Sequence, residues 1–373
     1  MLTTNIMIMQ VVLILMAVLL SGTIVSYILP KILLVSLRKR LVDPIDPRKV
    51  HKSTAIRLGG VSFFPAIFIS LSICIILVDM SYDVGFDVQS AIFVEAAALL
   101  ILYSVGLYDD IIGVKYRSKF VMQIVTAVML TASGTYLKSI YFFDGVITMP
   151  VWFSVPFTIL LIVFVTNAIN LIDGINGLAS MLSIIALIVY GVVFFLVDNS
   201  LYAAICFISA GAIAPFWYHN VFGIRKRNTT RIFMGDCGAL VVGFLLSIMA
   251  IRVWNIPSGS SEYISSNVCH ILAYTVLFVP CLDVVRVVLH RKRKKKPLFL
   301  PDNNHIHHKF MALGCTPKQA LGRIVGIQVG FLLLNLLLCN VVNIINILII
   351  DLIVWTIMHI LLTKRIKDKN VNK

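Results

Sequence analysis

Charge is scarce in this sequence: 13% of its residues are Asp, Glu, Lys or Arg, whereas 59% are hydrophobic. A soluble globular domain usually carries about twice that share of charged residues, so this class of protein is excluded. Acidic residues are the rarest, with 17 Asp and Glu against 32 Lys and Arg. The 7 cysteines stand singly, without a Cys-x-x-Cys pair, so neither a disulfide framework nor a cysteine zinc site is indicated.

Long apolar runs are abundant instead. About eleven of them approach the length that crosses ~30 Å of hydrocarbon. They cover residues 5–29, 61–78, 91–108, 120–137, 151–165, 178–197, 201–218, 238–254, 271–289, 324–341 and 344–362. A short stretch with Asn340 and Asn343 is all that separates the last two, which leaves about ten spans as an alternative. Inside a bilayer the backbone must satisfy its own hydrogen bonds, so we predict an all-α polytopic integral membrane protein with a single domain, residues 1–373.

Basic residues predict the orientation of these spans. Nearly all of the 32 Lys and Arg residues fall in alternate connections, at 31–57, 115–119, 225–231, 286–323 and after 364, with Lys138 and Arg252 as exceptions. Cytoplasmic loops near helix ends retain positive charge, so we expect the amino terminus outside and the carboxyl terminus in the cytoplasm. The net charge of +15 therefore mostly reflects the predicted orientation of the chain in the membrane. The positively charged cytoplasmic face would also attract anionic lipids and nucleotide phosphates. Nucleic acid is not an expected partner.

Acidic and amide side chains gather at span ends on the predicted cytoplasmic side. They are Asp109 and Asp110 at the end of the third span, Asn167, Asn170 and Asp173 at the end of the fifth, and Asp236 before the eighth. Carboxylates near a membrane are costly and usually mark ion or substrate sites. Carboxylates from separate helices beside a basic loop fit Mg²⁺, which takes oxygen ligands and substrate phosphates.

Each of these acidic pieces also has a purely structural interpretation. Asp109 and Asp110 point about 100° apart on a helix and can take different roles, or they can simply cap a helix end. Asn167, Asn170 and Asp173 repeat every three positions before two glycines, and we call them the Asn/Asp stripe. A purely structural turn would give the same pattern. Asp236 stands between glycines at a helix start, where an N-cap is common.

A histidine-rich segment follows the basic run at 290–297. Its three histidines, His305, His307 and His308, have a spacing that allows a transition metal, but no cysteine or nearby carboxylate cluster completes such a site. Phosphate contact is favoured instead. The basic run by itself is typical of a positive-inside loop.

Taken in this order, these pieces resemble the polyprenyl-phosphate N-acetylhexosamine-1-phosphate transferase family, glycosyltransferase family 4. The matching residues are His51 with Arg57-Leu-Gly-Gly60, Asp109-Asp110 with Lys119-Phe120 and Gln123, the Asn/Asp stripe, Phe233-Met-Gly-Asp236, Pro280-x-x-Asp283-x-x-Arg286 and His305-x-His307-His308. The last form is similar to the undecaprenyl-phosphate GlcNAc-1-phosphate transferase branch, whereas phospho-MurNAc-pentapeptide translocases usually show three consecutive histidines. Asn176, Ile56 and Ala239 depart from the Asp, Pro and Ser that the family commonly has, so the sugar specificity is open.

The resemblance implies an enzyme that moves GlcNAc-1-phosphate from a UDP-sugar to undecaprenyl or another polyprenyl phosphate and releases UMP. Such a step initiates a cell-envelope polysaccharide, for example lipopolysaccharide. It would take place at the cytoplasmic face of a bacterial inner membrane with Mg²⁺, for which Mn²⁺ could substitute. Whether the protein forms a homodimer is left open by the sequence.

The resemblance also implies residue roles. Asp109, Asp110 and Asp173 would be catalytic, Asp236 would hold the metal, His51 and Lys119 would contact the phosphate or lipid, and Asn167, Asn170, Asn176, His305, His307 and His308 would bind nucleotide and sugar. A phosphate monoester has a second pKa near ~6 and is mostly a dianion at neutral pH, so direct displacement is favoured over an aspartyl-phosphate route.

Three other functions remain as alternatives at this point. One is the related translocase step of peptidoglycan synthesis, and another is a non-catalytic membrane scaffold, which would not need the acids. The third is a membrane transporter, in which intramembrane acids bind ions near the midplane. Glu95, Asp283 and Asp351 lie well inside predicted spans, and Arg286 is one turn from Asp283 as a plausible partner.

Overall fold

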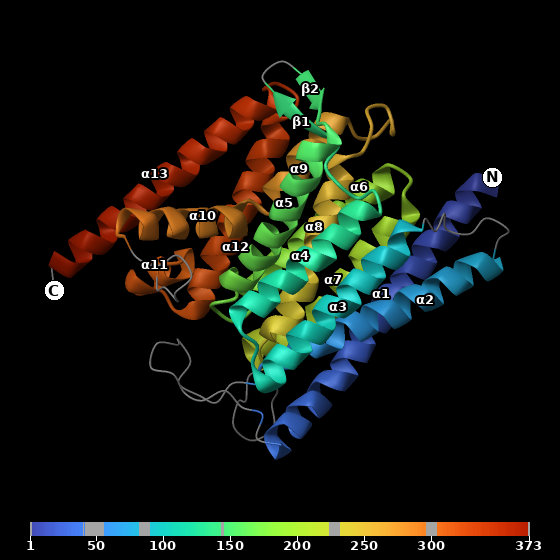
Figure 1. The fold of residues 1–373 in the computed structure, drawn as a ribbon, viewed down its shortest axis with the longest axis horizontal. Coiled ribbons are helices and arrows are strands. Elements are labelled where there is room, and N and C mark those ends of the chain that lie inside the picture. Colours follow the sequence, from blue (N-terminus) through green and yellow to red (C-terminus); the bar gives the residue numbers. More distant parts are fainter. Residues whose placement is uncertain are drawn as a thin grey trace.

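The structure is a computed structural model that describes residues 2–39, 41, 56–81, 90–142, 145–223, 232–295 and 304–371 (Figure 1). Its first half contains α1 Leu2–Arg38, the 3-10 turn η1 Gly59–Ser62, α2 Phe63–Ser81, α3 Ala91–Ile112, α4 Tyr116–Ala132, the strands β1 Ser139–Phe142 and β2 Gly145–Thr148, and α5 Val151–Ile172. Its second half contains α6 Leu178–Leu196, α7 Ser200–Phe222, α8 Gly235–Trp254, α9 Ser266–Thr275, α10 Phe278–Arg293, α11 Ile306–Ala312, α12 Pro317–Leu338 and α13 Ile344–Val371.

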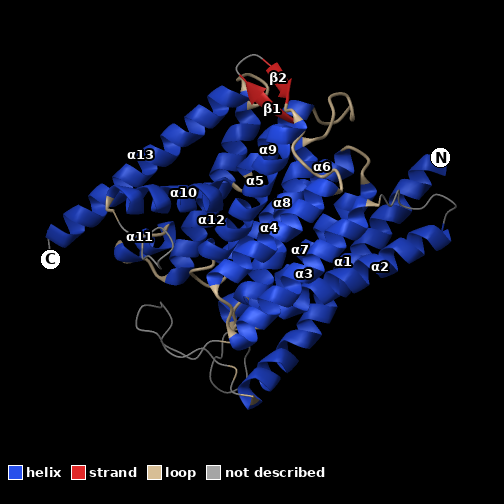
Figure 2. Cartoon of the chain, viewed as in Figure 1, coloured by secondary structure: helices blue, strands red, loops and turns tan. Residues whose placement is uncertain are grey.

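Helices dominate the described chain, and most of them run side by side (Figure 2). Within the described residues, 9 helices are long and apolar enough to cross a membrane, and the pair α9–α10, bent by 50°, would make 10. Helix α4 has 17 residues, which is the short limit for a span. The predicted all-α polytopic class is confirmed, whereas the count of eleven and the orientation stay predictions.

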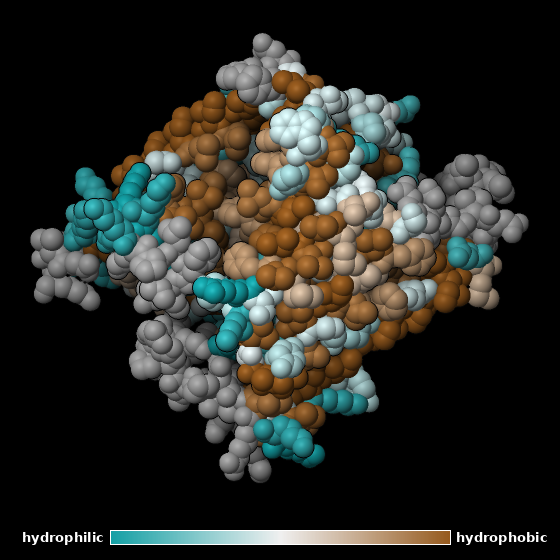
Figure 3. Space-filling model, viewed as in Figure 1, coloured by the Kyte–Doolittle hydropathy of each residue, from teal (hydrophilic) through white to brown (hydrophobic). Residues whose placement is uncertain are grey.

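The surface of the bundle shows why it belongs in a bilayer. Hydrophobic side chains cover a broad face of the molecule (Figure 3). On α13, for example, Ile353 is 52% exposed, Ile357 52% and Ile360 61%. Hydrophobic side chains exposed over the length of a helix are stable in lipid rather than in water.

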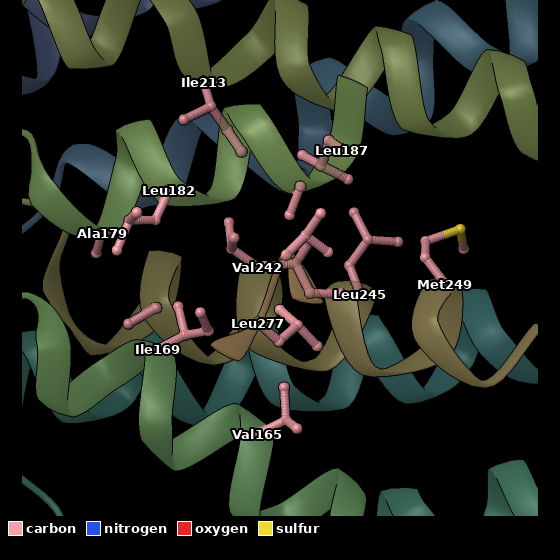
Figure 4. Packing of buried hydrophobic residues seen from close by; sticks show 14 of the residues in the cluster. Val165, Ile169, Ala179, Leu182, Leu187, Ile213, Val242, Leu245, Met249 and Leu277 are labelled. Carbon is pink, nitrogen blue, oxygen red and sulfur yellow. The ribbon is translucent and has the colours of Figure 1, made fainter. Parts of the chain in front are cut away.

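Helix α8 is the centre of the bundle, and every residue from Cys237 to Met249 is buried. In Figure 4 its residues Val242, Leu245 and Met249 lie among side chains of α5, α6 and α7. Close approach is possible because small residues face each other: a Cβ built on Gly106 of α3 would lie 2.4 Å from the Cα of Cys237. The first turn of α8 is thereby fixed beside the last turns of α3.

Two features of the fold were not predicted from the apolar runs. The strands β1 and β2 pair in antiparallel orientation, with Ile140 opposite Ile147. The run at 271–289 is broken into α9 and α10, with the break at residues 276–277. The last two runs are separate helices, α12 and α13, so they do not merge into one span.

The exceptional Arg252 is explained by a buried ion pair. Its Nε donates to Oε1 of Glu95 at 2.7 Å, and its guanidinium carbon lies 4.2 Å from the ring centroid of Tyr202. Glu95 is 3% exposed, so this pair joins α3 to α8 inside the bundle. A buried charge with a partner in place can be structural, which weakens the ion-carrier alternative for Glu95.

Candidate active site

Four helices bring polar side chains together at one end of the bundle. Lys119 at the start of α4 donates from Nζ to Oδ2 of Asp109 in α3 at 2.9 Å, and the same Nζ lies 3.6 Å from Oδ2 of Asp236 in α8. Asn170 of α5 donates from Nδ2 to the other oxygen of Asp236 at 2.5 Å. We call Asp109, Lys119, Asn170 and Asp236 the acidic cluster. The sequence placed these residues on separate helix ends, and the fold joins them.

The acidic cluster is accessible to a ligand. The side chains of Lys119 and Asp236 are 22% and 20% exposed, while that of Asp109 is 8% exposed. Asp109 also accepts a hydrogen bond from the Val114 N–H at 2.6 Å, which fixes the carboxylate beside the link from α3 to α4. A phosphate that enters here meets an ammonium group held between two carboxylates.

Asp110 has a different environment from its neighbour Asp109. Its Oδ1 accepts the N–H of Asp236 at 2.8 Å and its Oδ2 accepts the N–H of Cys237 at 2.9 Å. The first N–H groups of a helix have no partner within the helix, and the helix dipole favours an anion there. Asp110 of α3 therefore caps α8 and sets the position of Asp236. The structural interpretation of the Asp pair thus holds for Asp110, and Asp236 itself is not the N-cap. A direct catalytic role for Asp110 stays a prediction.

The Asn/Asp stripe links α5 to both neighbours. Asn167 donates from Nδ2 to Oε1 of Gln123 in α4 at 2.6 Å, as Asn170 does to Asp236 in α8. Asp173 follows the end of α5, where burial, and then the negative charge of Asp236, raise its pKa to about 7. The Asp236 charge is the smaller of the two causes, and a bound cation would offset it.

The turn after α5 contains unused hydrogen-bonding capacity. Both side-chain atoms of Asn176, Nδ2 and Oδ1, are buried without a partner among the described residues. A buried amide with no partner costs about 1–3 kcal/mol, so it is a natural contact for a polar ligand. This supports, without testing, the predicted role of Asn176 in binding nucleotide or sugar.

The histidine segment lies directly against this turn. A Cβ built on Gly174 would lie 2.2 Å from both Cε1 and Nε2 of His307, so only a glycine leaves room for the ring. The rings of His307 and His308 are 4.1 Å apart between centroids. Burial, and then the neighbouring His308, lower the pKa of His307 to about 3, so its ring is neutral at neutral pH. His307 is therefore suited to hydrogen bonding rather than to charge neutralisation.

Asp283 orients the first histidine. Nδ1 of His305 lies 2.8 Å from Oδ2 of Asp283, whose other oxygen accepts the Ile306 N–H at 3.0 Å and Nη2 of Arg286 at 2.7 Å. A carboxylate partner places the proton on Nδ1 and leaves Nε2 for a ligand. The predicted Asp283–Arg286 pair is confirmed, but its hold on His305 was missed because 22 residues separate the two.

Asn220 is another residue that the sequence did not single out. Its Oδ1 accepts the Gly177 N–H at 2.5 Å, and its Nδ2 donates to the Ile232 carbonyl at 2.7 Å. It thereby fixes the turn after α5 beside the strand-like segment before α8. An isolated amide at the end of an apolar span was the only available signal.

The predicted site residues are mostly brought together. Those described in one connected region are Asp109, Asp110, Lys119, Asn167, Asn170, Asp173, Asn176, Asp236, His305, His307 and His308. His51 lies outside the described residues.

A magnesium site can be assessed from the donors that are present. Among the described residues, no three His, Cys, Asp or Glu side chains are close enough to form a closed metal site. The carboxylates of Asp109, Asp173 and Asp236 would offer oxygen ligands, and Mg²⁺ is commonly bound by one or two carboxylates together with substrate phosphates. The mutual repulsion of Asp173 and Asp236 also fits a cation. These residues fit an open magnesium site better than a closed one.

Comparison with known proteins agrees with this geometry. Residues 92–254 match the family described as glycosyl transferase family 4, a region that contains the acidic cluster and the Asn/Asp stripe. The chain is 28% identical over 322 residues to the probable undecaprenyl-phosphate N-acetylglucosaminyl 1-phosphate transferase of Bacillus subtilis (strain 168), an alignment of 86% of this chain and 82% of that protein. It is 28% identical over 293 residues to the undecaprenyl-phosphate alpha-N-acetylglucosaminyl 1-phosphate transferase of Salmonella typhi, covering 77% and 73%. The resemblance indicated by the motifs is confirmed.

Proposed function

We propose, on the premise that this chain is a member of glycosyl transferase family 4, that it transfers N-acetylglucosamine 1-phosphate from UDP-N-acetylglucosamine to undecaprenyl phosphate and releases UMP. The names of both relatives support the acceptor and the transferred group. The observation that carries the proposal is the joining of Asp109, Lys119 and Asp236, from three helices, into one accessible cluster at a single end of the bundle. Carboxylates near the bilayer midplane, as in many transporters, are not what this cluster resembles.

The reaction is a substitution at phosphorus. An oxygen of the lipid phosphate attacks the β-phosphorus of the UDP-sugar, the bond to the oxygen bridging the two phosphorus atoms breaks, and UMP leaves with that oxygen. Because the lipid phosphate is mostly a dianion at neutral pH, it needs orientation and charge compensation more than a base. Asp109, whose carboxylate is already fixed by Lys119 and the Val114 N–H, is suited to orient the acceptor rather than to accept its proton.

Lys119 supplies the positive charge on the protein side. Its Nζ lies between the carboxylates of Asp109 and Asp236, so it can move to a phosphate oxygen without leaving the cluster. Asp236, with Asp173 nearby, would hold Mg²⁺, and the chemistry that the ion supplies is Lewis-acid stabilisation of the diphosphate charge. Mn²⁺ has similar oxygen preferences and could substitute.

The remaining polar groups define a second region for the nucleotide and sugar. The ring of His307 in α11 packs on Gly174, and the unpaired amide of Asn176 belongs to the same turn as that glycine. His305 can contact a phosphate or sugar oxygen through Nε2, because Nδ1 is held by Asp283. We place these contacts at the cytoplasmic face of a bacterial inner membrane, where the basic connections are expected.

The test is a reconstituted assay with undecaprenyl phosphate, Mg²⁺ and a panel of UDP-sugars, scoring release of UMP. The panel contains UDP-N-acetylglucosamine, UDP-N-acetylgalactosamine and UDP-MurNAc-pentapeptide. We expect turnover with the first and none without the lipid or with the pentapeptide. Release of UMP only from the pentapeptide substrate would assign the peptidoglycan step instead. Accumulation of a solute in vesicles, with no UMP formed from any donor, would assign a transporter.

A further inference from the structure

A groove of about 570 Å³ lies between α10 and α13, and none of its lining residues belongs to the acidic cluster. One part of its wall is apolar. Leu282 and Leu289 of α10 face Leu352, Trp355 and Ile360 of α13 across it. Leu289 and Ile360 are 50% and 61% exposed on helices that face the bilayer, so a lipid chain can enter from the side.

The other part of the wall is cationic. Arg293 of α10, Lys309 of α11, and Lys364 and Lys367 of α13 line it, and no Asp or Glu is among the described residues that do so. Hydrophilic side chains gather over the ends of α10 and α13, next to the hydrophobic length of α13 (Figure 3). A groove that is apolar at one end and positive at the other is complementary to an amphiphile with an anionic head.

A buried and unpartnered side chain marks the place of that head. His359 of α13 is 6% exposed and lines the groove, and its Nε2 is buried without a partner among the described residues. Its Nδ1 lies 3.3 Å from Nζ of Lys309, whose other contact is the hydroxyl of Thr363 at 2.9 Å. Burial, and then the charge of Arg286, lower the pKa of Lys309 to about 8, and a bound anion would offset the second cause.

We propose that this groove binds the phosphate headgroup of an anionic phospholipid of the surrounding bilayer, with an acyl chain along α10 and α13. The lining offers cations, a histidine and apolar surface, but no carboxylate for a metal ion. A phosphate held there is bound and not transferred, which distinguishes this lipid from the acceptor. The inference goes beyond the proposed reaction and does not depend on it.

The bound lipid would also steady the histidine segment. Lys309 follows His308 directly in α11, and Arg286, which lines the groove, holds the same Asp283 that orients His305. The headgroup would therefore contact Arg286 and Lys309, which adjoin the histidine segment.

The experiment compares lipid binding by the full-length protein in a neutral detergent. The Lys364→Gln/Lys367→Gln double variant removes two groove cations, and Arg365→Gln/Lys369→Gln is the matched control, because those two residues lie on the other side of α13. Phosphatidylglycerol or phosphatidylcholine is titrated in, and bound lipid is counted by native mass spectrometry together with the shift in melting temperature.

We expect phosphatidylglycerol to bind the wild type and the control variant equally well. Its affinity for the groove variant should be about tenfold lower, a slightly smaller loss than two basic side chains usually contribute to binding at an anionic surface. Phosphatidylcholine should bind none of them specifically. Equal binding of phosphatidylglycerol by both double variants, or equal binding of the two phospholipids by wild type, would overturn the proposal. Displacement of phosphatidylglycerol by undecaprenyl phosphate at equal concentration would instead assign the groove to the acceptor. None of these readouts needs turnover, so failure here is separable from failure of the proposed reaction.

Discussion

Replacing Asp110 by alanine tests whether this carboxylate acts by positioning α8 or by touching substrate. In the structure both of its oxygens accept backbone N–H groups at the start of α8, from Asp236 at 2.8 Å and Cys237 at 2.9 Å. Alanine leaves both donors without an acceptor, and one of them belongs to the fully buried Cys237. The start of α8, and with it the Asp236 side chain, should lose its fixed position.

The magnitude follows from the lost contacts. A buried N–H without an acceptor costs about 1–3 kcal/mol, and the lost anion at a helix N-terminus about 0.3–1 kcal/mol. Removing a half-buried carboxylate recovers part of this, because desolvation of the charge no longer opposes folding. We expect a net loss of about 2 kcal/mol, which is about 3 °C in Tm for a chain of this size. Asp110→Asn keeps one acceptor and should lose about half as much.

The assay pairs thermal unfolding in detergent with UMP release. Asp109→Ala is the matched control, because it removes the neighbouring carboxylate without touching the α8 N–H groups. We expect Asp109→Ala to change Tm by less than about 2 °C, as for a partly exposed ion pair, while turnover falls by about 100-fold or more. Asp110→Ala should lower both quantities, and Asp110→Asn should recover part of each.

One pattern of results would refute this reasoning. If Asp110→Ala kept the wild-type Tm but lost turnover as completely as Asp109→Ala, then Asp110 would act directly on the reactants. If Asp110→Ala changed neither quantity, the observed cap would have no energetic importance.

Three other predictions concern the metal, the turn and the pH dependence. Asp236→Asn should abolish Mg²⁺-dependent UMP release while membrane insertion and Tm stay near wild type; retained activity would exclude Asp236 from the metal shell. Gly174→Ala should lower Tm and raise the KM for the UDP-sugar by about tenfold, because a Cβ would lie 2.2 Å from the His307 ring; Gly326→Ala, with open space around it, should be neutral or slightly stabilising, and equal effects of both would contradict the packing. The pKa of Asp173 is raised from 3.8 to about 7, so ionisation of this carboxyl lowers the stability of the folded protein as pH rises through this interval. Because the ionised carboxylate is the form that binds a cation, the apparent Mg²⁺ affinity should rise with pH near 7. In Mg²⁺ titrations over a series of pH values, Asp173→Asn should remove the rise in affinity near pH 7. An unchanged rise would exclude Asp173 as a metal ligand.

The motifs carried more information than the helix pattern did. Asp109, Asp110 and Asp236 could be assigned to one site from the sequence alone, because carboxylates are scarce in a membrane chain and each of these ends or begins an apolar run. Lys119 could be added because it recurs with them in one family motif. The apolar runs predicted the helices but not the break between α9 and α10, since hydropathy is insensitive to a bend within a buried run.

Local sequence could not separate the two adjacent acids. Consecutive positions on a helix point about 100° apart, but which of Asp109 and Asp110 faces Lys119 and which caps α8 depends on where α4 and α8 pack against α3. The close contact of Gly106 with Cys237 sets how α8 packs against α3, and it joins residues that are far apart in the chain.

The sequence by itself determined the class of protein, most of the long apolar helices, the family resemblance and the set of candidate residues, because these depend on composition, spacing and residue type. The tertiary structure decided how those residues divide their work: Asp110 caps α8, Asp283 orients His305, and the His307 ring packs on Gly174. Such contacts depend on the relative positions of helices that are distant in sequence, and those positions are fixed only when side chains from all of them pack together.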